Sequence, residues 1–196
     1  MTKVSLPELV NEAIAGKVVS FPTDTVPALA VKPERSKLIF ALKQRPQDKP
    51  LILMGASAAD LWSYVTGTQE ELEIWQQVAA KYWPGALTLV LPSSAKVPIE
   101  MHPTEPTSIG IRVPNLEIAQ IILTQTGPLA TTSANISGKP SLETTSAIEE
   151  AFPEILALDC TKLNIDAKIG SGLASTVAKW TRKGWEILRQ GNIKQI

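Results

Sequence analysis

The stretch Leu129-Ala130-Thr131-Thr132-Ser133-Ala134-Asn135-Ile136-Ser137-Gly138-Lys139-Pro140-Ser141 predicts a buried strand that leads directly into a ligand site. A short apolar beginning is followed by five hydroxyl side chains and one amide, and Gly138 and Pro140 interrupt the backbone. Hydroxyl and amide groups both donate and accept hydrogen bonds. The segment therefore suits a phosphorylated or carboxylated small molecule bound where the strand ends.

Upstream, Lys43-Gln44-Arg45-Pro46 places two cations where a predicted helix ends. Cations are favourable at a helix C-terminus for dipole reasons alone, so a solvated helix end is the alternative interpretation. Pro46 and Pro50 stiffen the loop, which limits the directions that Arg45 can take. Because an arginine fork and a lysine point charge complement each other on a polyphosphate, the pair favours a polyanion pocket. Neither common glycine-rich phosphate loop is present in the sequence.

Two other segments carry polar side chains at strand ends. Phe21-Pro22-Thr23-Asp24-Thr25 places two hydroxyls around a carboxylate, which either caps a turn or organises a ligand loop. In Ser108-Ile109-Gly110-Ile111-Arg112, alternation puts Ser108, Gly110 and Arg112 on one face of a strand. An arginine is costly to bury unpaired, so we expect Arg112 to find a carboxylate from the protein or from a substrate.

The overall composition excludes several classes of protein. The 196 residues fit one domain, residues 1–196, and the 19 basic and 19 acidic residues cancel, which weakens a primary RNA-binding interpretation. A single cysteine, Cys160, rules out an internal disulfide and a multi-thiolate metal site, and His102 is the only histidine. We expect no protein-bound metal. Because no apolar run approaches membrane-spanning length and no signal peptide is evident, we expect a cytoplasmic protein without membrane contact.

Hydrophobic periodicity and turn residues predict a mixed α/β order of elements. The pairs Ser5 with Glu8 and Thr68 with Glu71 indicate capping boxes at two helix starts. Other helices are expected from Pro33 through Leu42, from Ser57 through Tyr64, after an Asn115 cap, and at 146–152. Strands are expected at 17–21, 28–31, 51–54, 86–91, 109–113, 129–132, 155–158, 175–180 and 185–188. Residues 92–107 contain four prolines and no periodicity, which predicts a long surface loop that serves as a lid.

In their order along the chain, these segments resemble the YrdC-type family of threonylcarbamoyl-AMP synthases. The resemblance rests on Pro22-Thr23-Asp24-Thr25-Val26, Leu42-Lys43-Gln44-Arg45-Pro46 with Pro50-Leu51-Ile52, Trp83-Pro84-Gly85-Ala86-Leu87-Thr88, Ile111-Arg112-Val113-Pro114, Thr132-Ser133-Ala134-Asn135-Ile136-Ser137-Gly138, Ser175-Thr176-Val177 and Leu188-Arg189-Gln190-Gly191. The lysine-x-arginine and serine-alanine-asparagine elements together are quite specific.

The resemblance implies an α/β (α+β) fold with a twisted mixed sheet, flanked by helices, that encloses a large positively lined cavity. It implies the ATP-dependent synthesis of L-threonylcarbamoyl-AMP from L-threonine, bicarbonate and ATP, with Mg²⁺ accompanying ATP and release of pyrophosphate. A downstream tRNA threonylcarbamoyl transferase complex would then modify adenosine 37 of tRNA. Double-stranded RNA or tRNA is a further partner that the resemblance allows.

The resemblance also implies a role for individual residues. Thr23 and Thr25 would hold threonine, and Arg112 would clamp its carboxylate. Lys43 and Arg45 would act as the catalytic cations on the phosphates. The residues that would line the nucleotide are Lys43, Arg45, Lys49, Ser108, Thr131, Ser133, Asn135, Ser141 and Arg189.

The sequence departs from the family pattern after the threonine motif. Val26-Pro27-Ala28-Leu29-Ala30 stands where the family usually has an aromatic residue and glycines, so the threonine-binding wall is expected to differ in shape. One alternative is therefore an RNA-binding or translation-accessory paralogue that has the fold without the synthase activity. Another alternative is a domain that handles carbamoyl phosphate with the same anion pocket.

Overall fold

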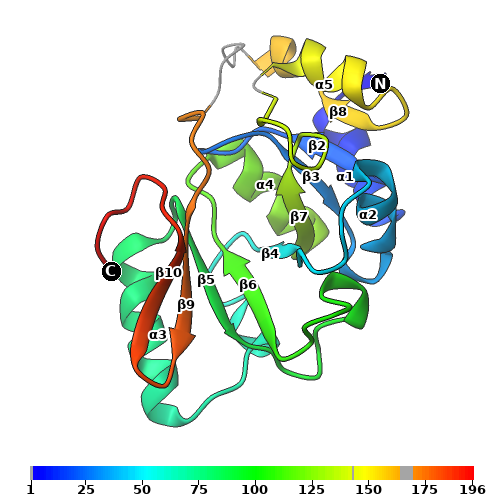
Figure 1. Cartoon of the computed structure of the whole chain (residues 1–196). Coiled ribbons are helices and arrows are strands. Elements are labelled where there is room, and N and C mark those ends of the chain that lie inside the picture. The colour runs from blue at the N-terminus through cyan, green and yellow to red at the C-terminus, as the bar shows by residue number, and fades with distance from the viewer. Residues whose placement is uncertain (1, 143, 164–169) are drawn as a thin grey trace.

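One mixed sheet, in the strand order β1-β8-β2-β3-β7-β4-β6-β5-β9-β10, organises the molecule (Figure 1). The structure is a computed structural model that describes residues 2–142, 144–163 and 170–196. The strands are β1 Thr2–Val4, β2 Val19–Phe21, β3 Ala28–Val31, β4 Ile52–Met54, β5 Leu87–Pro92, β6 Ser108–Arg112, β7 Leu129–Ser133, β8 Leu156–Leu158, β9 Thr176–Thr181 and β10 Gly184–Arg189. This architecture confirms the predicted α/β fold with a mixed sheet. A single domain over residues 1–196 stays a prediction.

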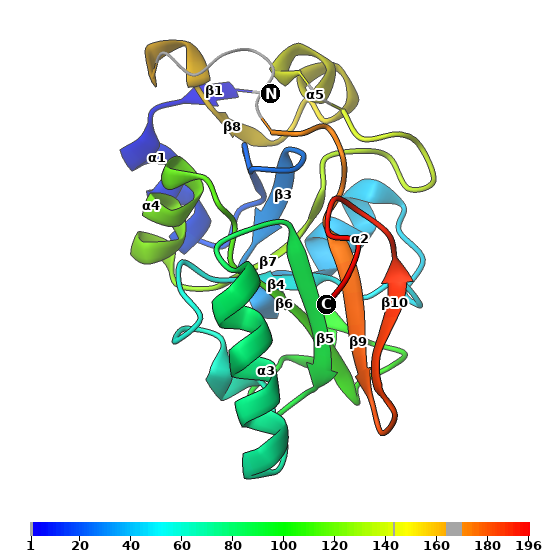
Figure 2. The same cartoon turned by 90° about the vertical axis from the view of Figure 1, so that its left-hand side faces the viewer.

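Helices cover both faces of the sheet. They are α1 Leu6–Ile14, α2 Lys37–Lys43, α3 Gln69–Tyr82, α4 Glu117–Thr126 and α5 Thr145–Ala151. Figure 2 shows α1 and α4 side by side, and both belong to the core cluster that also contains Ala28 and Ala30 of β3. The alternate residues Leu29 and Val31 belong to the other cluster, with α2, α3 and α5. Because side chains alternate across a strand, β3 is buried on both faces.

The strand register gathers polar residues on one face of the sheet. Ala28 of β3 lies opposite Ser133 of β7, and Thr131 of β7 lies opposite Ile52 of β4. Met54, which is two residues after Ile52 on β4, lies opposite Arg112 of β6. Cross-strand partners share a face. Residues from four strands, distant in sequence, therefore line the same surface.

Several predicted elements are confirmed. Strand β3 has the predicted bounds of 28–31, and α3 begins with the predicted capping box of Thr68 and Glu71. The strands predicted near residues 52, 87, 109, 129, 156, 176 and 185 are also present, and their bounds differ from the predicted ones only at the ends. The three-residue strand β1 was not predicted, because its parallel pairing with β8 leaves no periodic signal in so short a run.

The helix start predicted at Ser5 is confirmed, since Ser5 is the N-cap of α1, but the predicted capping box is absent because Ser5 forms no side-chain cap hydrogen bond. Two other predictions of helix starts are wrong. The helix expected from Ser57 is replaced by turns and the 3₁₀ helix Trp62–Tyr64, because the Asp60 carboxylate accepts from both the backbone N–H and the hydroxyl of Ser57. The N-cap of α4 is Leu116 rather than Asn115.

The segment 92–107 is more ordered than the sequence suggested. It contains the 3₁₀ helix Ile99–Met101, and Met101 and His102 are buried. The Met101 carbonyl accepts from the Leu51 N–H at 3.0 Å, and Thr104 Oγ1 donates to the Gln47 carbonyl at 3.1 Å. These bonds tie the segment to the loop that contains Arg45. Its role as a lid stays a prediction.

Among the residues that the structure describes, no helix is both long and apolar enough to cross a lipid bilayer.

Candidate functional site

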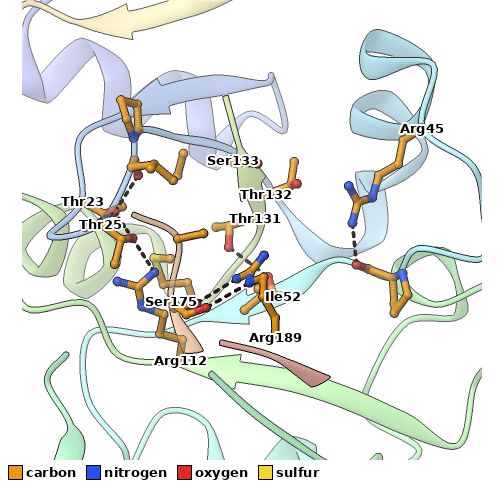
Figure 3. A pocket seen from close by; sticks show the side chains of 16 residues that line it. Thr23, Thr25, Arg45, Ile52, Arg112, Thr131, Thr132, Ser133, Ser175 and Arg189 are labelled. Carbon is orange, nitrogen blue, oxygen red and sulfur yellow. Dashed lines mark hydrogen bonds between the residues drawn. The ribbon is translucent and has the colours of Figure 1, made fainter. Parts of the chain in front are cut away.

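A cavity of about 120 Å³ opens on the polar face formed by β3, β7, β4 and β6 (Figure 3). It is closed by the loop after β2, the loop after α2, and the ends of β9 and β10. Its lining residues are Thr23, Thr25, Val26, Pro27, Ala28, Arg45, Pro50, Ile52, Met54, Arg112, Thr131, Thr132, Ser133, Ala174, Ser175 and Arg189. Segments from both ends of the chain therefore meet at one site.

The loop after β2 contributes two buried hydroxyls. Thr23 Oγ1 donates to the Val26 carbonyl at 2.7 Å and accepts from the Thr25 N–H at 3.2 Å. The two threonine hydroxyl oxygens lie 3.0 Å apart. These bonds fix the loop in a tight turn against the cavity.

Arg112, at the end of β6, is almost completely buried and paired. Its Nη2 forms an ion pair with Asp24 Oδ1 at 2.6 Å, its Nη1 donates to Thr25 Oγ1 at 2.8 Å, and its Nε donates to the Gly85 carbonyl at 3.1 Å. The pKa of Arg112 is lowered overall, because the effect of burial exceeds the opposing effect of the Asp24 carboxylate. The predicted carboxylate partner is thus present, and it comes from the protein.

Arg45 and Arg189 both line the same cavity. Arg45 donates from Nε to the Lys49 carbonyl at 2.7 Å and from Nη2 to the Pro50 carbonyl at 3.1 Å. Arg189 donates from Nε to the Ser175 carbonyl at 3.0 Å and from Nη2 to its hydroxyl at 3.2 Å. Burial, and then the positive charge of Arg189, lower the pKa of Arg45. Two guanidinium groups held by neutral partners, beside an array of hydroxyls, suit a small polyanion.

Lys43 lies behind the cavity wall rather than in it. Its ammonium donates to Thr132 Oγ1 at 3.3 Å, to Asn135 Oδ1 at 3.0 Å, and to the Ser133 carbonyl. Asn135 in turn accepts from the Ser133 hydroxyl at 2.6 Å and donates to the Lys139 carbonyl at 2.6 Å. Burial, and then the nearby charge of Arg45, lower the pKa of Lys43 to about 7. Lys43 thus organises the loop after β7.

The structure brings most of the predicted site residues together. Those that line the cavity are Thr23, Thr25, Arg45, Arg112, Thr131, Ser133 and Arg189. Lys43, Lys49, Ser108, Asn135 and Ser141 are not among the lining residues. Lys49 is exposed and contributes only its carbonyl to Arg45, and the carbonyl of Ser108 contacts His102 Nδ1 at 2.9 Å. The ligand contacts expected for all of the predicted site residues stay predictions.

Sequence reasoning missed the contribution of Gly170 and its neighbours, which looked like an ordinary loop. Gly170 has a φ of +86°, and a Cβ there would lie 2.5 Å from the Thr25 carbonyl oxygen and 2.6 Å from that of Thr23. The N–H groups of Ser171 and Gly172 donate to the carbonyls of Asp24 and Thr25, at 3.0 Å and 2.9 Å. A short Gly-x-Gly is too common to signal such packing. No pattern in the sequence could have identified it.

Within the described ranges, no group of three or more histidine, cysteine, aspartate or glutamate side chains could hold a metal ion.

Comparisons with known proteins identify the family. The Sua5/YciO/YrdC family model, described as "Telomere recombination", matches residues 13–191. The chain is 38% identical over 182 residues to the threonylcarbamoyl-AMP synthase of Pyrococcus abyssi (strain GE5 / Orsay). The aligned region covers 91% of this chain and 51% of that protein. It is also 37% identical over 145 residues to the threonylcarbamoyl-AMP synthase of Vibrio campbellii (strain ATCC BAA-1116). That aligned region covers 72% of this chain and 77% of the relative.

A solved structure agrees with these relatives. The crystal structure of P. abyssi Sua5 complexed with L-threonine matches with a TM-score of 0.84 at 34% identity, over 96% of this chain and 54% of that one. This chain therefore belongs to the Sua5/YciO/YrdC family. It spans about half the length of its P. abyssi relative and about three quarters of its V. campbellii relative.

Proposed function

We propose that this chain synthesises L-threonylcarbamoyl-AMP from L-threonine, bicarbonate and ATP, with release of pyrophosphate. The observation that carries the proposal is the convergence of Arg45, Arg112 and Arg189 on one cavity lined by hydroxyls. Two further findings support it: the curated relatives are named threonylcarbamoyl-AMP synthase, and a related structure contains L-threonine.

The reaction needs orientation and charge neutralisation more than it needs a strong acid or base. Bicarbonate takes up a proton and loses water to give carbon dioxide. The amine of threonine loses a proton and forms a C–N bond with this carbon dioxide, which gives a carbamate. A carbamate oxygen then bonds to the α-phosphorus of ATP while the bond to pyrophosphate breaks. Two anions that repel each other must be held together, and the departing charge must be balanced. Guanidinium groups in a partly buried cavity perform both tasks without histidine.

The chain's own residues divide this work. Arg45 and Arg189 supply positive charge inside the cavity, and Thr131, Thr132 and Ser133 supply hydroxyl groups along β7. Lys43 supports the site from behind through the loop after β7. Magnesium would accompany ATP and shield its phosphates.

The product is a reactive mixed anhydride, so it requires a protein that accepts it. As part of the proposal, a tRNA threonylcarbamoyl transferase complex in the cytoplasm receives it for N6-threonylcarbamoyladenosine formation. Direct binding of tRNA or double-stranded RNA stays a prediction. The balance of 19 basic and 19 acidic residues gives no support to a protein that acts mainly on RNA.

Pyrophosphate release from ATP by the purified protein tests the proposal. We expect release that requires both L-threonine and bicarbonate. Arg45→Ala should reduce the rate roughly 30- to 1000-fold, because the loss of one preorganised charge costs about 2–4 kcal/mol in the transition state. Arg182→Ala, which removes an exposed arginine from the turn between β9 and β10, is the matched control and should keep full activity. No turnover with any amino acid, together with tight binding of duplex RNA, would favour the accessory protein instead.

A further inference from the structure

Thr88 is a fully buried polar residue of β5 that does not belong to the cavity lining. Its side-chain Oγ1 lies 2.9 Å from Oγ of Ser175, which does line the cavity. Its γ-methyl group faces the neighbouring strand β6, where a Cβ added to Gly110 would lie 3.4 Å from it. Because the methyl group packs on one side and the hydroxyl bonds on the other, the Thr88 side chain is held in one orientation.

Ser175 connects Thr88 to the cavity. The backbone next to Ser175 is fixed, because the Thr176 N–H donates to the Ala86 carbonyl at 2.9 Å. The guanidinium of Arg189 donates from Nε to the Ser175 carbonyl at 3.0 Å and from Nη2 to the Ser175 hydroxyl at 3.2 Å (Figure 3). The hydroxyl of Ser175 is therefore held between a buried threonine and an arginine.

Burial determines the direction of the hydrogen bond between Thr88 and Ser175. A hydroxyl has one proton to donate and two lone pairs with which to accept. Among the described residues, Ser175 is the only hydrogen-bond partner of Thr88 Oγ1. If Thr88 accepted from Ser175, the proton of Thr88 would be buried without an acceptor, which costs the desolvation free energy of that group. Thr88 is therefore the donor, and Ser175 is the acceptor.

This direction determines where the proton of Ser175 points. Ser175 Oγ accepts from both Thr88 and Arg189, so both of its lone pairs are used. Within the described part of the chain, the proton of Ser175 has no acceptor. Since Ser175 lines the cavity, this proton is left for an acceptor inside the cavity.

We propose that Thr88 is a positioning residue of the site, which does not touch a ligand but fixes the Ser175 hydroxyl as a donor to a substrate oxygen. This polarity favours ligand oxygens that only accept, such as those of a carboxylate, a carbamate or a phosphate, and it disfavours a ligand N–H. The identity of the substrates rests on the proposed function. The polarity from Thr88 to Ser175 rests on the contacts alone.

Calorimetric binding of L-threonine and of ATP tests this role. Ser175→Ala identifies the ligand that Ser175 contacts, because binding of that ligand should weaken at least about threefold. Thr88→Val keeps the branched shape but removes the hydroxyl, so binding of the same ligand should weaken about 3- to 10-fold. Thr88→Ser keeps the hydroxyl and should bind within about twofold of the wild type. Unchanged binding of both ligands by Ser175→Ala or by Thr88→Val, or a loss that Thr88→Ser does not restore, would overturn the proposal.

Melting temperatures test the direction of the hydrogen bond without any ligand. Ser175→Ala leaves the Thr88 proton without an acceptor and should lower the melting temperature. Adding Thr88→Val to Ser175→Ala should restore part of this loss, because no buried donor then remains unpaired. In the wild-type background, Thr88→Val alone should lower the melting temperature. A single Thr88→Val variant that melts above the wild type, or equal losses from Thr88→Val in both backgrounds, would contradict the inferred direction.

Thr181→Val is the matched control for the loss of a threonine hydroxyl. Thr181 Oγ1 donates to the Gly184 carbonyl at 2.7 Å in the turn between β9 and β10, outside the cavity lining. The control should lower the melting temperature and leave binding of both ligands within about twofold. An equal loss of binding in Thr181→Val and Thr88→Val would reduce Thr88 to a structural role and overturn the proposal. Wild-type protein that binds neither L-threonine nor ATP would refute the proposed function, and the melting temperatures would still test the polarity.

Discussion

At the scale of single residues, Lys43 shows how a buried charge links stability to pH. Its side chain is almost fully buried, and burial together with Arg45 lowers its pKa from 10.5 to about 7. Between pH 7 and about 10.5 the folded protein therefore binds fewer protons at this site than the unfolded chain does. Since stability rises with pH wherever the unfolded state binds more protons, the cost of burying this ammonium group decreases as the pH rises above 7.

We therefore predict that the melting temperature of the wild type rises relative to that of Lys43→Met as the pH increases from 7 to 9. Thermal unfolding of both proteins at several pH values measures this difference. Lys183→Met, at the exposed turn after β9, controls for the loss of a lysine and should follow the wild type. Parallel pH profiles for the wild type and Lys43→Met would show that Lys43 titrates normally.

The sequence predicts the chemistry of single residues better than their location. A buried arginine inside an apolar strand requires a carboxylate partner, and Arg112 forms an ion pair with Asp24. Lys43 resembled any cation at a helix end, and its burial depends on a loop about 90 residues away in sequence. Nothing local distinguishes a solvated lysine from one that a distant loop covers.

At the scale of elements, the start of α3 is the clearest case of local sequence fixing local structure. Thr68 Oγ1 accepts from the Glu71 N–H at 3.2 Å, and Glu71 Oε2 accepts from the Thr68 N–H at 2.9 Å. Glu71 also accepts from Trp180 Nε1 at 2.9 Å, which joins the helix start to β9. The capping box therefore stabilises both the helix and its packing.

Thr68→Ala should lower the free energy of unfolding by about 1 kcal/mol, because it removes the side-chain acceptor of the N-cap. Urea denaturation followed by circular dichroism measures this loss. Gln77→Ala, at an exposed position within the same helix, should change the stability by less than about 0.5 kcal/mol. Equal effects of the two substitutions would mean that the cap contributes nothing.

Gly170 and Gly127 form a matched pair that separates backbone strain from close packing. Both have positive φ angles, +86° and +74°, but a Cβ at Gly127 meets no atom within 4 Å. Because Gly127 has a ψ of −176°, in a backbone region essentially confined to glycine, Gly127→Ala should cost about 1–3 kcal/mol of backbone strain alone. Gly170→Ala adds a collision with the carbonyls of Thr23 and Thr25 in the loop after β2. It should therefore lower the free energy of unfolding by more than Gly127→Ala does, and it should also weaken L-threonine binding. Urea denaturation and calorimetry measure the two effects, and equal losses for both variants would show that the contact is unimportant.

Elements with a local cause were predictable, and those that depend on distant partners were not. The capping box of α3 and the apolar run of β3 lie within a few residues of the structure that they determine. Strand β1 exists because β8 lies beside it, and the turn at Ser57 replaces a helix because one carboxylate satisfies two donors. Such effects appear only when the chain has folded.

At the scale of the whole molecule, the cavity is a product of topology. Crossovers in the sheet order bring β3, β7, β4 and β6 together, while Ser175, just before β9, and Arg189, at the end of β10, complete the cavity. No single segment forms the cavity. The family resemblance named seven of the sixteen lining residues as site residues, but the hydrogen-bond partners of each arginine became visible only in the assembled site.

A crystal structure of this protein with L-threonine and a non-hydrolysable ATP analogue tests the central claim most directly. The account predicts that both ligands bind in the cavity, with their anionic groups beside the guanidinium groups of Arg45, Arg112 and Arg189. Ligands bound outside this cavity would contradict it.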